Sequence, residues 1–219
     1  MVLFGADATT FMYNSLSYLE LAPQYECFDG TEWLSCKPAD FCGTDIQYRI
    51  DYSCPTCLHN WVDKLSLTCE PKWKIGLLGS SLWMGWVFSL LFLPRIADLR
   101  GRRWIYLIGM WLLMPILFAM LFTRSLNAMI AIIFMQGFLS TVRVSIGYVY
   151  MLEFIPKPNQ TIIGTWFSMQ TAIISLLATL YFSSISTHWF WFVMVGVILL
   201  VFCCVMAVML PESPKYLLK

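Results

Sequence analysis

Five long runs of apolar residues, each almost free of charge, constrain the fold of this chain more than any other feature. The runs cover residues 74–94, 104–123, 126–152, 160–183 and 189–210. Each comes close to the ~20 residues that an α-helix needs to cross the hydrocarbon core of a membrane, whereas a β-barrel strand needs about half as many. The sequence therefore predicts an all-α fold, a polytopic membrane helix bundle in a lipid bilayer.

A weaker apolar run occupies residues 1–22 and contains Asp7, Asn14 and Glu20. It lacks the positively charged start and the small-residue cleavage site of a secretory signal peptide. We interpret it as a first transmembrane helix, either whole or truncated at its beginning. Residues 74–210 are then predicted to hold helices two to six.

The composition excludes several other classes of protein. Of the 219 residues, 59% are hydrophobic and only 12% are charged, which is about half the charged fraction of a soluble domain. The net charge of +1 gives no reason to expect a nucleic-acid partner. The chain has no glycine-rich phosphate loop, no nucleophile elbow and no HExxH motif, and its only histidines are His59 and His188. We therefore expect neither an enzyme nor a cofactor.

Residues 94–103 form a strongly cationic segment between two of the apolar runs, which we interpret as a short turn. The segment carries four arginines and one aspartate, Asp98. Because membrane-protein loops rich in arginine and lysine stay on the cytoplasmic side, this segment should be cytoplasmic. By alternation, residues 153–159 and the tail at 211–219 are predicted to be cytoplasmic, and residues 23–73 to form an extracellular loop.

The predicted extracellular loop contains six cysteines: Cys27, Cys36, Cys42, Cys54, Cys57 and Cys69. Disulfide bonds persist in oxidising compartments, so the cysteines agree with the orientation that the arginines indicate. The loop is too short for a core of its own and would depend on disulfides, whose pairing the sequence does not choose. Cys54-Pro55-Thr56-Cys57 superficially resembles a redox or zinc motif, but the compartment favours plain bridges and no metal. The acidic loop is either a vestibule that concentrates cations or a solvated cap.

Three of the predicted cytoplasmic segments resemble motifs of the major facilitator superfamily of transporters. Asp98-Leu99-Arg100-Gly101-Arg102-Arg103 resembles the D-R-x-G-R-R motif after the second helix of that family. Glu153-Phe154-Ile155-Pro156 is similar to the E-F-x-P element after the fourth helix, and P-E-S-P-K-Y-L-L at 211–218 to the P-E-S-P-R-W-L-L element after the sixth. The large cysteine-bearing loop favours the organic cation and anion transporter branch over the sugar porters, which share the inner motifs.

The resemblance implies the first six-helix half of the twelve-helix major-facilitator fold. Such a protein moves small organic solutes across the plasma membrane by alternating access, and its partner would be a complementary C-terminal six-helix half. In that family, charged groups tie the cytoplasmic helix ends together in the closed state. The corresponding gate network here is Asp98, Arg100, Gly101, Arg102, Arg103, Glu153, Glu212 and Lys215.

Several residues depart from the motifs. Leu99 replaces an arginine, Pro94 stands where a glycine is usual, and Lys215 replaces an arginine. The ammonium group of lysine cannot form the paired hydrogen bonds of the planar arginine guanidinium, so the contact of Lys215 with a carboxylate should be weaker. The alternative for the inner arginines is that they only orient the chain in the membrane.

Arg143 is the sole basic residue deep within a predicted span. A charge there costs at least ~2.5 kcal/mol, so the side chain should face the bundle interior, either in a solute cavity or snorkelling toward the cytoplasmic end. Asp7 is a candidate partner. Five further side chains either line the same cavity, where aromatic faces attract organic cations, or only pack and anchor the helices. They are Trp83, Trp86, Tyr148, Trp166 and Gln170.

Small and aromatic residues give two more structural expectations. Ser81, Gly85 and Ser89 recur at helical spacing, which is typical of close packing between membrane helices. Trp189 and Trp191 stand at the predicted outer end of the last span, where an interfacial aromatic belt is expected.

Three functions are compatible with the sequence. The chain is an organic-ion transporter, a sugar porter, or a non-transporting membrane protein that binds an extracellular partner through its disulfide loop. The sequence does not give the charge of a solute, because Arg143 favours anions whereas the acidic loop favours cations.

Overall fold

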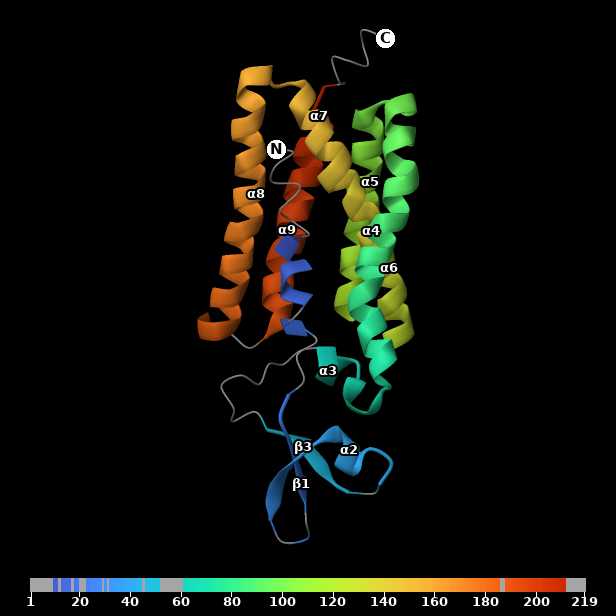
Figure 1. Cartoon of the computed structure of the whole chain (residues 1–219), viewed down its shortest axis with the longest axis vertical. Helices are drawn as coiled ribbons and strands as arrows, with labels where there is room; N and C mark the ends of the chain where they lie inside the picture. Colours follow the sequence, from blue (N-terminus) through green and yellow to red (C-terminus); the bar gives the residue numbers. More distant parts are fainter. Residues whose placement is uncertain are drawn as a thin grey trace.

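Five long apolar helices stand side by side in the computed structural model (Figure 1). The structure describes residues 10–211 except 12, 17, 20–22, 29, 31, 45, 52–60, 186 and 187. Within that part of the chain, five helices are long and apolar enough to cross a membrane, by length and composition. They are α4 (Lys72–Arg100), α5 (Arg102–Phe122), Leu126–Glu153, α8 (Lys157–Leu180) with its extension, and α9 (Trp189–Val208). The predicted helical membrane bundle is confirmed.

Two of these helices contain a wider π-helical turn. The helix at Leu126–Glu153 consists of α6 (Leu126–Thr141), η2 (Val142–Ile146) and α7 (Gly147–Glu153). The second wide turn, η3 (Tyr181–Ile185), extends α8. Such turns are rare, and they often mark functional sites.

The predicted first helix is described only in part. Residues 10, 11, 13–16, 18 and 19 are helical. Their aromatic rings pack on later helices, with Phe11 5.1 Å from Phe192 and Tyr18 5.0 Å from Phe182 between ring centroids. The count of six helices stays a prediction, because the remaining residues of 1–22 lie outside the described part.

The interpretation of residues 94–103 as a turn is wrong. The chain stays helical through Arg100, with Pro94 inside α4, and α5 begins at Arg102. Gly101 alone reverses the chain, with φ 93° and ψ 136°, a backbone conformation that residues with a side chain rarely adopt. A single glycine therefore brings the ends of α4 and α5 together.

Helices α4 and α6 touch through their backbones. A Cβ on Gly85 would lie 2.1 Å from the carbonyl oxygen of Phe134, and one on Gly137 would lie 2.0 Å from that of Leu82. The stripe of Ser81, Gly85 and Ser89 is buried, in agreement with its predicted packing role. The two glycines therefore lie on the two facing helices of one crossing, where the backbones of α4 and α6 are in contact.

A small disulfide subdomain, residues 25–50, stands at the end of the bundle opposite α7 (Figure 1). It holds an antiparallel sheet in the order β2–β1–β3, formed by β1 (Tyr25–Phe28), β2 (Trp33–Cys36) and β3 (Tyr48–Ile50). In the register, Tyr25 of β1 pairs with Cys36 of β2 and Ile50 of β3. The short helix α2 (Pro38–Phe41) follows β2. The all-α prediction missed this sheet.

Two disulfides stabilise the subdomain. Cys27 bonds to Cys36 across β1 and β2, and Cys42 bonds to Cys69 in the turn η1 (Leu67–Cys69) that precedes α4. The second bond ties the subdomain directly to the start of the bundle. Cys54 and Cys57 lie outside the described residues.

The helix α3 (Trp61–Lys64) docks on the same end of the bundle. Trp61 is fully buried, with its ring edge-on to Trp189, 6.2 Å between centroids. The Nζ of Lys64 donates to the carbonyl oxygens of Met120 (3.1 Å) and Leu121 (2.9 Å) and lies 4.6 Å from the Trp189 ring centroid. Lys64 thus satisfies carbonyls that the end of α5 leaves without a helical partner.

This docking corrects the interpretation of Trp189 as an interfacial anchor. Trp189 is buried, because Trp61 and Lys64 cover it. Trp191 is exposed, as an anchor would be. Burial, and to a smaller extent the neighbouring Arg124, lowers the pKa of Lys64 from 10.5 to about 8.

Gly137→Ala should destabilise the bundle, because the added Cβ would overlap the backbone of Leu82, which cannot swing aside. We expect a loss of roughly 1–3 kcal/mol in the free energy of unfolding, measured as a lower thermal unfolding midpoint in detergent. Gly76→Ala on α4 is the matched control, since a Cβ there meets open space. An equal fall in both variants would contradict the role of the crossing.

The lowered pKa of Lys64 predicts that the protein becomes more stable as the pH rises from about 8 towards 10.5. In that range the unfolded chain keeps the Lys64 proton and the folded chain has lost it, so raising the pH relieves a penalty that is fully present below pH 8. We expect the thermal midpoint to rise by roughly 2–4 °C relative to Lys64→Met over this range. Identical pH profiles for the two proteins would contradict the prediction.

Candidate functional site

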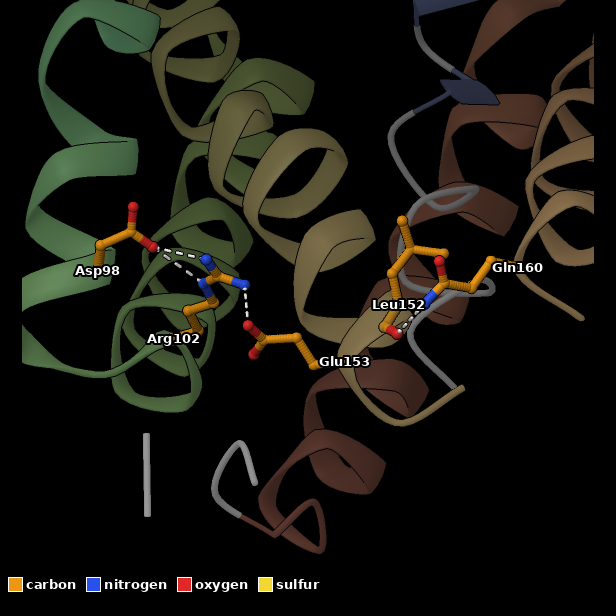
Figure 2. Close-up of polar contacts among 5 residues, drawn as sticks. All are labelled: Asp98, Arg102, Leu152, Glu153 and Gln160. Carbon is orange, nitrogen blue, oxygen red and sulfur yellow. Dashed lines mark hydrogen bonds and ion pairs between the residues drawn. The ribbon is translucent and has the colours of Figure 1, made fainter. Parts of the chain in front are cut away.

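Arg102 joins three helices at the end of the bundle that carries the Gly101 reversal (Figure 2). Its Nη2 and Nε lie 2.7 and 3.1 Å from Oδ1 of Asp98, at the end of α4. Its Nη1 lies 2.5 Å from Oε1 of Glu153, the last residue of α7. The side chain of Arg102, at the start of α5, therefore bridges two carboxylates.

The two ion pairs differ in burial, so we expect them to differ in strength. The side chains of Arg102 and Glu153 are 15% and 13% exposed, whereas that of Asp98 is 59% exposed. Solvent and salt screen an exposed pair, so the pair with Asp98 should contribute less than about 1 kcal/mol. The pair with Glu153, which links α5 to α7, is screened less than the pair with Asp98, which links α5 to α4.

Further hydrogen bonds hold the same helix ends. Arg103 donates to the carbonyl oxygen of Val208 at the end of α9 (3.3 Å), and the Tyr150 hydroxyl donates to that of Pro211. Gln160 on α8 donates to the carbonyl oxygens of Leu152 and Ile155, each at 3.1 Å (Figure 2 shows the bond to Leu152). Sequence reasoning missed the parts played by Tyr150 and Gln160, because neither belongs to a charged pair.

The structure brings only part of the predicted gate network together. Asp98, Arg102 and Glu153 are in contact, while Arg103 binds the end of α9. Arg100 is exposed and, among the described residues, is joined to neither carboxylate. Gly101 acts through the backbone. Glu212 and Lys215 lie outside the described residues.

A cavity between the helices contains Arg143, which is 3% exposed. Its lining residues are Thr10, Tyr13, Leu82, Trp86, Gln136, Ser140, Arg143, Val144, Phe167 and Thr171. Arg143 is the one charged side chain among them, and the walls are mainly aromatic and hydroxylic. This lining offers hydrogen bonds, aromatic faces and a positive charge to a polar organic molecule.

The other predicted cavity residues divide into three groups. Trp86 lines the cavity, and Trp83 stacks on it with parallel rings 5.5 Å apart while remaining half exposed. Tyr148 lines a neighbouring pocket with Gly164 and Ser168. Trp166 is exposed, and Gln170 is absent from the described lining of both pockets.

Sequence reasoning overlooked two polar side chains that reach this cavity. Gln136 and Ser140 of α6 are buried in its wall, and with Arg143 they recur at intervals of four and three residues. That spacing places all three on one helix face. A polar stripe in an otherwise apolar helix was the available signal.

The family model described as Major Facilitator Superfamily matches residues 71–218, well over half of the chain. The chain belongs to the Major Facilitator Superfamily. The predicted resemblance is confirmed, and this major-facilitator chain is a multi-pass membrane protein.

Curated relatives of this major-facilitator chain include Solute carrier family 22 member 2 from three mammals. The rat protein (Rattus norvegicus) is 25% identical and the mouse protein (Mus musculus) 23% identical, each over 94% of this chain and 38% of the relative. The orangutan protein (Pongo abelii) is 24% identical over 72% of this chain and 28% of the relative. The chain thus spans less than two fifths of the length of the curated relatives it matches.

The geometry explains one departure from the major-facilitator motif. Leu99 is exposed, and its side chain takes no part in the contact between Asp98 and Arg102. The spacing that matters is the four residues from Asp98 to Arg102, because the Gly101 reversal between them brings the end of α4 and the start of α5 within ion-pair distance. The motif therefore keeps its ion pair although one arginine is missing.

Glu153→Gln should destabilise the protein more than Asp98→Asn. The first change removes the partly buried partner of Arg102, and we expect a cost of about 1–3 kcal/mol, against less than about 1 kcal/mol for the exposed pair. Thermal unfolding midpoints of the two variants provide the measurement. Arg100→Gln is the control, because it removes a charge and should leave the thermal midpoint unchanged. A larger fall in the midpoint for Asp98→Asn than for Glu153→Gln would refute the ranking.

Proposed function

We propose that this chain is the N-terminal six-helix portion of a secondary-active transporter that moves small organic ions by alternating access. The observation that carries the proposal is the bridge from Arg102 to Asp98 and Glu153 at one end of a bundle whose interior cavity holds Arg143. A transporter needs both parts: a site for solute near the membrane centre and contacts at a helix end that can break and re-form.

The ion pairs of Arg102 suit a reversible gate. An arginine between two carboxylates can give up one partner and keep the other, so opening does not leave it as an isolated buried charge. Contacts of this kind bias two conformations that differ by a few kcal/mol. In this proposal the Arg102 end is cytoplasmic, Arg103 and Gly101 support the gate, and Glu212 and Lys215 join it.

The cavity supports a solute that is organic and polar. Trp86, Tyr13 and Phe167 supply aromatic surface, and Arg143 supplies a positive charge. Its volume of about 90 Å³ is well below the roughly 300–1,000 Å³ of pockets for drug-sized ligands. We therefore propose that a complementary six-helix half supplies the rest of the site. The likeness to solute carrier family 22 supports the organic-ion class and a plasma-membrane location.

A second candidate function has one observation in its favour. The disulfide subdomain exposes Phe28, Trp33 and Leu34 on adjoining strands β1 and β2. Exposed apolar side chains of this kind are typical of protein-binding surfaces. The chain would then be a non-transporting membrane protein that binds an extracellular partner through the subdomain.

Uptake of labelled organic ions by reconstituted protein tests the proposal. The chain is placed in proteoliposomes alone and together with a C-terminal six-helix half of a related transporter, and uptake of an organic cation and an organic anion is measured. We expect uptake with both halves present, and a fall of at least about tenfold in Arg143→Gln, because a charged hydrogen bond to the solute is lost.

Two controls make this result specific. Arg95→Gln removes an exposed arginine on α4 that lies outside the cavity lining and should leave uptake unchanged. The amount of folded protein in the vesicles is measured for each variant. Unchanged uptake by folded Arg143→Gln would contradict the proposed cavity, and no uptake of either ion by any combination would favour the partner-binding function.

A further inference from the structure

The wide turn η2 lies between the cavity and the ion pairs. The backbone N–H of Gly147 donates to the carbonyl oxygen of Val142, five residues earlier, where an α-helix would bond four residues back. Arg143 lies within this turn, and Glu153 follows ten residues after Arg143 on the same helix. The wide turn η2 therefore contains Arg143 and lies before Glu153 on the same helix.

The extra residue in the turn sets the direction of everything that follows. Successive residues of an α-helix are about 100° apart around the axis, so adding or removing one residue turns the rest of the helix by that angle. With the wide turn in place, Arg143 is in the cavity and Glu153 meets Arg102. A regular α-helix through the same residues would point one of these side chains elsewhere.

Helix α5 has a notch that fits the wide turn. A Cβ on Gly109 would lie 2.5 Å from Cγ1 and 2.8 Å from Cβ of Val142, so any larger residue at position 109 would push η2 away. Val142 is buried there with Ala97 and Ile146. Gly109 is two helical turns after Arg102, so α5 presents the notch and the gate arginine on one face.

We propose that Gly109 is a positioning residue, which holds η2 in the register that directs Arg143 into the cavity and Glu153 onto Arg102. Gly109 lines neither described pocket and makes no contact with the carboxylates; it acts through Val142. The part of this inference that concerns solute uptake rests on the proposed function, whereas the part that concerns helix register does not.

Cross-linking between the helix ends measures the register directly. Arg102→Cys and Glu153→Cys are combined, and the two thiols are bridged with a short bis-methanethiosulfonate reagent in the full chain. The cross-linked peptide pair is quantified by mass spectrometry. Because the cysteines replace the ion pair itself, the rate of bridging reports the register without help from the gate. Cys203 and Cys204 are buried and are kept.

Four backgrounds decide the outcome: Gly109→Ala, Gly76→Ala, Val142→Gly, and Gly109→Ala with Val142→Gly. Gly109→Ala should slow bridging at least about fivefold, because overpacking a helix contact shifts a conformational balance by that order. Gly76→Ala, whose Cβ meets open space, should leave the rate unchanged. When Val142→Gly has removed the side chain that fills the notch, adding Gly109→Ala should change the rate by less than about twofold.

The inference is overturned if Gly109→Ala bridges as fast as the parent, or if it slows bridging equally with and without the Val142 side chain. Uptake of the organic ions by the same variants, made without the two cysteines, should follow the bridging rates. If the parent takes up no organic ion, the proposed function fails, and the bridging rates still decide the role of Gly109.

Discussion

The backbone contact between α4 and α6 is the constraint on which the rest of the structure depends. Gly85 and Gly137 let the two helices approach so closely that a Cβ atom on either glycine would overlap the backbone of the facing helix. Trp86 and Gln136 stand next to these glycines and line the cavity from opposite helices. Thr141 then donates to the Trp86 carbonyl oxygen at 3.4 Å across the same interface. The close packing of α4 on α6 therefore also builds a wall of the candidate solute site. Such close fit is what holds membrane helices together, since apolar side chains gain little by association in lipid.

Buried positive charge is stabilised in three different ways along this bundle. Arg102 binds two carboxylates, Lys64 binds backbone carbonyl oxygens beside an aromatic ring, and Arg143 lies in a cavity whose walls include Gln136 and Ser140. Each arrangement offsets part of the cost of removing a cation from water, although burial still lowers the pKa of Lys64, and the three differ in how easily they can change. Carbonyl oxygens at a helix end are fixed by the backbone. Carboxylates on separate helices can part, so the side chain of Arg102 is the one suited to a moving contact.

The sequence predicted those features that depend on chemistry at single positions or along one helix. Long apolar runs predicted the helices, and the burial of Arg143 followed from the cost of its charge in lipid. The one-residue reversal at Gly101 was missed, because a glycine can end a helix or begin a loop and only the packing of α4 on α5 decides. The burial of Trp189 was missed because Trp61, which covers it, lies more than a hundred residues earlier. The sheet was also missed. Its strands are three or four residues long, too short to show a pattern in the local sequence, and the disulfide bond between Cys27 and Cys36 stabilises the pairing of β1 with β2.

The two ends of the bundle are built for different degrees of movement. At one end, a disulfide from Cys42 to Cys69 and the buried pair of Trp61 and Trp189 fasten the subdomain and α3 to the helices. Covalent bonds and buried aromatic contacts of this kind do not exchange partners without local unfolding. At the other end, the ion pairs of Arg102 join α5 to α4 and α7, and a hydrogen bond from Arg103 to a backbone carbonyl joins α5 to α9. The exposed pair with Asp98 can be replaced by water at modest cost, so a rearrangement of the kind proposed above would begin at the Arg102 end, with the disulfide end moving as one piece with the helices that carry it.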